Sequence, residues 1–104
     1  MENKYIEDNV FEIKSVNRSI NHYVIHGNLV KGSFDVGDYV KIKEKDFYIL
    51  EAYIDKIKLM DKFEINSTNE TYEESLIFYL NLFDEDIKIT NHHIIVKEQK
   101  IMKM

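Results

Sequence analysis

Apolar residues alternate with polar ones over several short stretches of this chain, which is the period of a half-buried β-strand. In residues 39–43, for example, Val40 and Ile42 fall on one face and their polar neighbours on the other. The pattern predicts strands at residues 11–16, 23–29, 39–43, 47–59, 75–83 and 92–97. Several short strands separated by turn signals are typical of a sandwich or a barrel.

The longest of these stretches, residues 47–59, changes phase in the middle. Leu50 and Ile54 share one face, and Ile57 takes over that face only three residues later. A phase change of this kind predicts a β-bulge near Asp55 and Lys56. Because a bulge bends its strand, it helps a sheet to close into a barrel.

Composition agrees with one compact domain. The chain has 104 residues, of which 44% are hydrophobic and 32% charged, so it has enough apolar surface for a single core. We expect residues 1–104 to form one all-β domain with frayed ends, a small closed or partly open antiparallel barrel of six to seven strands. The polar segment 66–74 is the exception, because Ser67 and Glu70 have capping-box spacing and predict a short helix or an ordered loop there.

All three glycines fall in one segment, at five-residue intervals: Gly27, Gly32 and Gly37. Gly27 lies within a strand pattern, where it permits close approach of a neighbouring backbone. Gly32 and Gly37 flank a turn, and at least one of them is expected to adopt a positive φ. Asp38 follows the last glycine directly.

This spacing resembles the β-barrel that translation-factor GTPases of the elongation factor Tu type carry as their second domain. Phe11, Ile13 and Val16 match the family's opening strand, the three glycines and Asp38 match its second strand and turn, and Val40 and Ile42 match the strand that follows. The resemblance spans about residues 9–96, with Thr90-Asn91-His92-His93 standing where the family has a different turn.

The resemblance implies a barrel and no catalysis. Family members bind guanine nucleotide through a separate domain, and no G-x-x-x-x-G-K-Ser/Thr motif occurs here, so GTP binding and hydrolysis are not expected. In the family this barrel contacts the ribosome or tRNA, but the residues of those contacts do not map onto this chain.

Charge and cysteine content restrict the other classes. The net charge is −5, there is a single arginine, and residues 63–104 have four basic against eight acidic residues, which argues against autonomous nucleic-acid binding. Cysteine is absent, so disulfides and thiolate chemistry are excluded. The first residues lack the pattern of a secretory signal and no segment is apolar enough to span a membrane, so we expect a cytoplasmic protein without cofactor.

Three groups of residues invite a chemical interpretation. His22 and His26 share a strand face, but with His92 and His93 they do not form the converging set that zinc requires. The run 84–86 is more typical of a solvated acidic turn than of a cation site. Glu51 and Asp55 would form a carboxylate pair only if the bulge between them allowed it. The sequence therefore predicts no catalytic or metal-binding residue.

A surface strip is the remaining candidate. If Val40, Leu50 and Ile54 face inward, the intervening residues face outward. These outward residues are Tyr39, Phe47, Ile49 and Tyr53. An exposed aromatic strip is typical of an interface, unless the segment 66–74, through Tyr72, or a terminus covers it.

We therefore expect a non-catalytic binding or adaptor module that engages a protein partner, or itself, through this strip. The alternative is a translation-associated factor that contacts a ribosomal component without GTPase activity.

Overall fold

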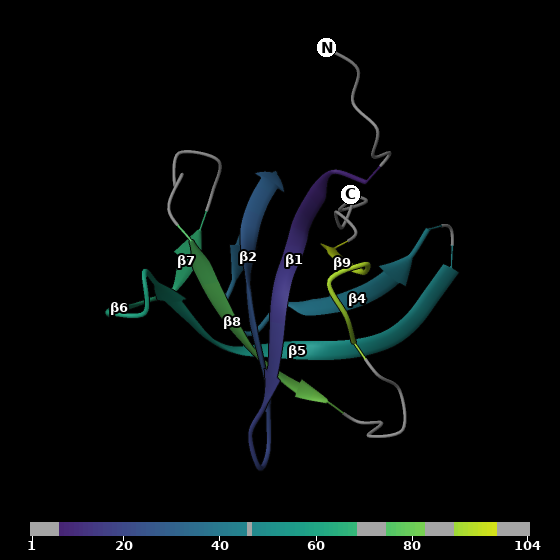
Figure 1. Ribbon diagram of the computed structural model, residues 1–104. Coiled ribbons are helices and arrows are strands. Elements are labelled where there is room, and N and C mark those ends of the chain that lie inside the picture. Colours follow the sequence, from purple (N-terminus) through teal and green to yellow (C-terminus); the bar gives the residue numbers. More distant parts are fainter. Residues whose placement is uncertain (1–6, 46, 69–74, 83–88, 98–104) are drawn as a thin grey trace.

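The computed structural model describes residues 7–45, 47–68, 75–82 and 89–97, and it contains strands but no helix in those ranges (Figure 1). The strands are β1 (Asn9–Arg18), β2 (Tyr23–Lys31), β3 (Phe34–Asp35), β4 (Tyr39–Glu44), β5 (Phe47–Leu59), β6 (Phe63–Ile65), β7 (Ser67–Thr68), β8 (Leu76–Leu82) and β9 (Ile94–Lys97). Each of the six predicted strands is present. The three short strands β3, β6 and β7 were not predicted.

Six strands close into a barrel in the order β4-β9-β1-β2-β8-β5, and β5 pairs back with β4 to complete the ring. All of these pairs are antiparallel. β6 lies outside the ring and pairs with the end of β5, at Ile57–Leu59. β3 pairs with β7 in a separate two-stranded sheet. The prediction of a small antiparallel barrel is confirmed in its closed form. Figure 1 shows β4 and β5 running side by side along one wall.

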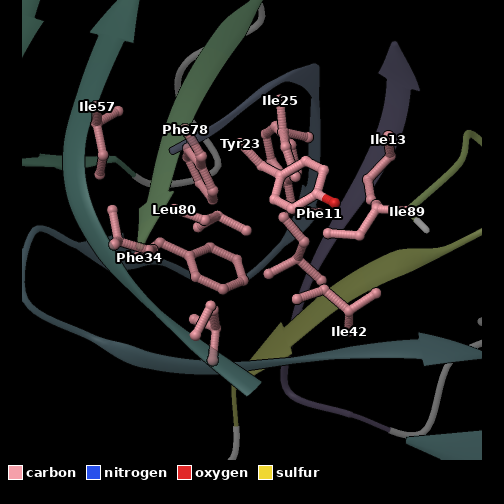
Figure 2. Close-up of a cluster of buried hydrophobic side chains, with 14 of the residues drawn as sticks. Phe11, Ile13, Tyr23, Ile25, Phe34, Ile42, Ile57, Phe78, Leu80 and Ile89 are labelled. Carbon is pink, nitrogen blue, oxygen red and sulfur yellow. The ribbon is translucent and has the colours of Figure 1, made fainter. Parts of the chain in front are cut away.

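Three phenylalanines fill the middle of the barrel (Figure 2). Phe11 stacks on Phe78 with ring centroids 4.1 Å apart, and Phe34 meets both rings edge-on at 6.5 and 5.4 Å. Phe34 comes from β3 and is fully buried, so this short strand contributes a large side chain to the core. Aromatic pairs in such geometries contribute about 0.5–1.5 kcal/mol beyond the area they bury.

Two bulges allow the long strand β5 to pair with both β4 and β8. The register of β5 against β8 shifts between Ile54 and Lys56, so Asp55 has no cross-strand partner and the predicted bulge is confirmed. A second shift, between Ile42 and Lys43 of β4, leaves Ile49 of β5 without a partner. The extra residue increases the local twist and bends β5, which allows it to pair with β4 along its first half and with β8 along its second.

The glycine predictions are also confirmed. Gly32 and Gly37 adopt φ of 82° and 97°, in the left-handed region. The Gly37 N–H donates to the Ile54 carbonyl at 2.7 Å, and the Ile54 N–H donates to the Asp38 carbonyl at 3.0 Å, so this turn is fastened to β5. Gly27 lies so close to β1 that a Cβ would fall against the Glu12 carbonyl oxygen.

The segment before the last strand differs from its prediction, and so does Ser67 of the polar segment 66–74. His92 and His93 precede β9 in a turn, where the His93 Nδ1 accepts a hydrogen bond of 3.0 Å from the Thr90 N–H. Ser67, predicted as a helix cap, belongs to β7, because its backbone pairs with β3. Residues 69–74 lie outside the described part of the chain.

Candidate functional site: the outer face of β4 and β5

The outer face of β4 and β5 is built from facing residue pairs along one ladder. Tyr39 faces Tyr53, Lys41 faces Glu51, and Lys43 faces Tyr48. The inward pairs between them, Val40 with Ala52 and Ile42 with Leu50, belong to the core. Because the ladder is part of the closed barrel, the outer side chains stand on a rigid support.

The structure places three of the four predicted strip residues at the surface. The residues Tyr39, Phe47 and Tyr53 are 42%, 73% and 42% exposed. Ile49 was expected to face outward, and this is wrong: it is half-buried and packs against the core, because it is the bulged residue of β5. Tyr48, which the sequence analysis missed, is 49% exposed and completes the set.

The sequence gives little indication that Tyr48 faces outward and Ile49 does not. Residues 47–50 are all apolar or aromatic, so alternation could not say which of them face outward. We call the exposed aromatic residues of the outer face the aromatic strip, and it comprises Tyr39, Tyr48 and Tyr53. Phe47 is exposed as well, but it adjoins Tyr48 in β5 and pairs with Glu44, so it points to the opposite face of the sheet. The expected cover from segment 66–74 is not formed by β7, which pairs with β3. Tyr72 lies outside the described residues.

Hydrogen bonds and ring contacts order the strip. The rings of Tyr39 and Tyr53 lie with centroids 5.2 Å apart. The Tyr39 hydroxyl donates a hydrogen bond to the Glu51 carboxylate. This bond, with desolvation and the charges of Glu51 and Tyr53, raises the pKa of Tyr39 from its usual 10.0 to about 12. The phenol therefore stays neutral throughout the physiological range.

Two lysines accompany the rings. The Nζ atoms of Lys41 and Lys43 lie 4.7 and 5.4 Å from the centroid of the Tyr48 ring, within the range of cation–π attraction. Lys43 also forms a buried ion pair with Glu7, which holds the chain before β1 against β4. The strip thus combines ordered aromatic rings with charged side chains that are themselves positioned.

A groove of about 1000 Å³ adjoins the strip at the Tyr39 end. Its lining includes Tyr39, Lys41 and Tyr53. Gly32 and Gly37 line it as well, with the pair in which Lys97 donates to Asp38 at 2.7 Å. The groove is large enough to receive side chains of a partner that docks on the strip.

The other chemical candidates of the sequence lie elsewhere. His22 Nε2 lies 2.8 Å from Asp55 Oδ2, and Glu51 is bound to Tyr39, so Glu51 and Asp55 have separate partners. Among the residues that the structure describes, no group of three or more His, Cys, Asp or Glu side chains could hold a metal ion. The acidic run 84–86 lies outside them.

We also compared the chain with known proteins and searched it for membrane-spanning helices. No protein-family model matches the chain, and no curated protein matches it. In the described ranges, no helix has both the length and the apolar character that a membrane crossing requires. We therefore infer function from the chemistry of the barrel surface.

Proposed function

We propose that this protein is a non-catalytic binding module that engages protein through the aromatic strip. The observation that carries the proposal is the exposure of Tyr39, Tyr48 and Tyr53 on the outer face of one rigid ladder. Tyrosine and other aromatic residues are enriched at protein interfaces, where their large and stiff side chains bury area with little loss of conformational entropy. The barrel interior is filled by Phe11, Phe34 and Phe78, which favours a surface function over a ligand held inside.

The strip supplies a substantial part of an interface. A buried aromatic side chain covers roughly 150–250 Å², so the three tyrosines at these exposures present roughly 200–330 Å². A specific interface buries about 800 Å² on each partner. Lys41 and Glu51, which lie between the Tyr39–Tyr53 pair and Tyr48 on the ladder, and the adjoining groove provide the remaining area.

The layout of the strip favours a second copy of the chain as the partner. A two-fold axis parallel to the strands would place Tyr39 of one copy against Tyr53 of the other. The same axis would place Lys41 of one copy against Glu51 of the other, so opposite charges meet across the interface. The face is therefore self-complementary, as a symmetric dimer requires.

Kinship with the second-domain barrel of translation GTPases is part of the proposal as well. Its support is the role of the three spaced glycines: Gly27 is packed against β1, and Gly32 and Gly37 have positive φ in the segment between β2 and β4. A ribosomal contact is not proposed, because none of the described surface features points to one.

The test is the mass of the protein in solution. We expect the wild-type chain to sediment as a dimer, and the double variant Tyr48→Ser with Tyr53→Ser to sediment as a monomer with an unchanged melting transition. Phe63→Ser is the matched control, since Phe63 is 58% exposed on β6, away from the strip, and its loss should leave the dimer intact. A monomeric wild-type chain, or a sharply lowered Tm of the double variant, would contradict self-association through the strip.

A further inference from the structure

A short segment lies between the two glycines that have positive φ. Gly32 and Gly37 adopt φ of 82° and 97°, and residues 33–36 between them contain β3. Among the strands that the structure describes, β3 pairs only with β7, through two residues, and it belongs to no ladder of the barrel. Glycine changes its backbone dihedrals at low cost, so both glycines are suited to act as hinges. We call residues 33–36 the strap.

The strap carries one side chain into the core. Phe34 is fully buried and meets the rings of Phe11 and Phe78 edge-on (Figure 2). Asp35 and Val36, which follow it in the strap, are exposed. Phe11 and Phe78 come from β1 and β8 of the barrel sheet and stack directly on each other. The core therefore keeps its own pair of stacked rings when Phe34 is withdrawn.

Three backbone N–H groups in or beside the strap bind groups outside it. The Ser33 N–H donates to Asn9 Oδ1 at 2.9 Å, and the Val36 N–H donates to the Asn66 carbonyl at 2.8 Å. The Gly37 N–H donates to a carbonyl of β5 at 2.7 Å. All three hydrogen bonds break if the strap turns outward about its glycines, so these amides report on its position.

One carboxylate fastens the strap to β9. Asp38 Oδ2 accepts hydrogen bonds from the Asp35 N–H and from Lys97 Nζ, each at 2.7 Å. The side chains of Lys97 and Asp38 are 19% and 22% exposed, so the ion pair is largely shielded from water. Lys97 Nζ also lies 5.4 Å from the centroid of the Phe34 ring. We call the Lys97–Asp38 pair the latch.

We propose that the strap opens as a unit about Gly32 and Gly37 while the barrel stays folded, and that the latch holds it closed. Local openings take place where few backbone hydrogen bonds and few buried side chains hold a segment. The strap has one buried ring and two paired residues, whereas each barrel strand pairs with two neighbours.

Opening of the strap alters the groove beside the aromatic strip. Ser33 of the strap lines the groove together with Gly32, Gly37 and Asp38. Tyr39 follows Asp38 directly and begins β4. The strap therefore controls the surface that is offered at this end of the strip. It does so within one chain, so the device does not depend on the proposed self-association.

The experiment is native-state hydrogen exchange of single amides in the full chain, followed by NMR. The reporters are the amides of Ser33, Val36 and Gly37, and the reference is the slowest amides of the β1–β2 and β5–β8 ladders. We expect the reporters to share one opening equilibrium and to exchange at least about tenfold faster than the reference. Urea should accelerate the reporters less, because opening the strap exposes less surface than unfolding the barrel.

Lys97→Met tests the latch. The ion pair is lost in the open strap and in the unfolded chain alike, so this variant should accelerate reporters and reference equally, by about fivefold. Asp38→Asn should act in the same way, because it keeps an acceptor for the Asp35 N–H but removes the charge. Lys62→Met is the control for net charge, since Lys62 is exposed in the turn between β5 and β6, and it should change neither rate.

Ile13→Val is the matched control for a contact that the open strap retains. Ile13 is buried on β1, and Figure 2 shows it on the far side of the core from Phe34. Its shortening should accelerate the reference by about fivefold and leave the reporters unchanged, because the barrel is intact in both positions of the strap.

Reporters that exchange at the reference rate, or with the urea dependence of the reference, would show that the strap opens only with the barrel and would overturn the proposal. Unequal opening of the three reporters, or no protection at any of them, would overturn it too. If both latch variants left the reporters unchanged, the ion pair would not be what holds the strap closed. A reporter rate that rose with Ile13→Val would also contradict an independent strap.

Discussion

Replacing Gly27 with alanine is expected to destabilise the barrel strongly, although it adds only one methyl group. The new Cβ would fall against the Glu12 carbonyl oxygen and within 2.7 and 2.9 Å of two ring carbons of Phe11. Neither neighbour can move easily. Glu12 belongs to the β1–β2 ladder, and Phe11 is fully buried and stacked on Phe78.

The magnitude follows from these two contacts. Overpacking a core costs about 1–3 kcal/mol, and more where the backbone has to shift, so we expect about 3 kcal/mol or more for Gly27→Ala. For a domain of this size that is a large part of the roughly 5–15 kcal/mol that favours folding. At about 4–8 °C per kcal/mol, Tm should fall by about 12–24 °C.

Gly37→Ala is the comparison that separates crowding from backbone strain. A Cβ at Gly37 would meet nothing within 4 Å, so only the φ of 97° opposes it. Holding alanine in that conformation costs about 1–2 kcal/mol. Gly37→Ala should therefore be the milder change.

Equilibrium unfolding in urea, followed by circular dichroism, measures the free energy of unfolding of both variants. We expect its dependence on urea concentration to be the same in the two. If the Gly27 variant proved as stable as the Gly37 variant, the close approach of β1 and β2 would not be a constraint on the fold. The reasoning from the glycine spacing would then be refuted.

Three further results are expected. Spectrophotometric titration should show a tyrosine with a pKa near 12, and Glu51→Gln should lower that pKa. Because folding raises the pKa of Tyr39, the hydrogen bond of its neutral phenol stabilises the fold below pH 10, and this stabilisation is lost as pH rises from about 10 to about 12. An unchanged titration curve in the variant would contradict this assignment. Glu7→Gln removes the carboxylate that pairs with the buried Lys43 ammonium, and should lower the free energy of unfolding, measured in urea, by about 2–4 kcal/mol. The double variant Glu7→Gln with Lys43→Met also removes the buried charge, so its loss of stability should be smaller. Equal losses in the two variants would mean that the ion pair is not the cause. Calorimetry with GTP should show no binding, since the sequence has no phosphate-binding loop, and a micromolar dissociation constant would contradict that expectation.

Much of the fold follows from local patterns. Alternation predicted the six barrel strands, because one face of each is buried and a slip of one residue would expose it. The phase change around Asp55 predicted the bulge for the same reason. The short strands β3, β6 and β7 have two or three residues each, too few for a period to be seen, so only their partners define them.

The surface sites depend more on the tertiary structure. Tyr39 and Tyr53 were placed correctly at the surface, because each is flanked by residues that are clearly inward. Ile49 was misplaced, because a second bulge lies within an apolar run that shows no alternation. Contacts such as that of Lys56 with Tyr79 had no signal in the sequence, because the two residues meet only where β5 and β8 pair in the sheet.

The sequence by itself determined the strand faces outside the apolar run 47–50, the bulge at Asp55 and the glycine turns, because alternation and backbone sterics act between residues that are near in the chain. Only the tertiary structure decided that β5 pairs with β4 and closes the ring, and hence which exposed side chains share a wall. The physical reason is that strand order depends on pairings between segments far apart in the chain, which the periodicity of each strand does not encode.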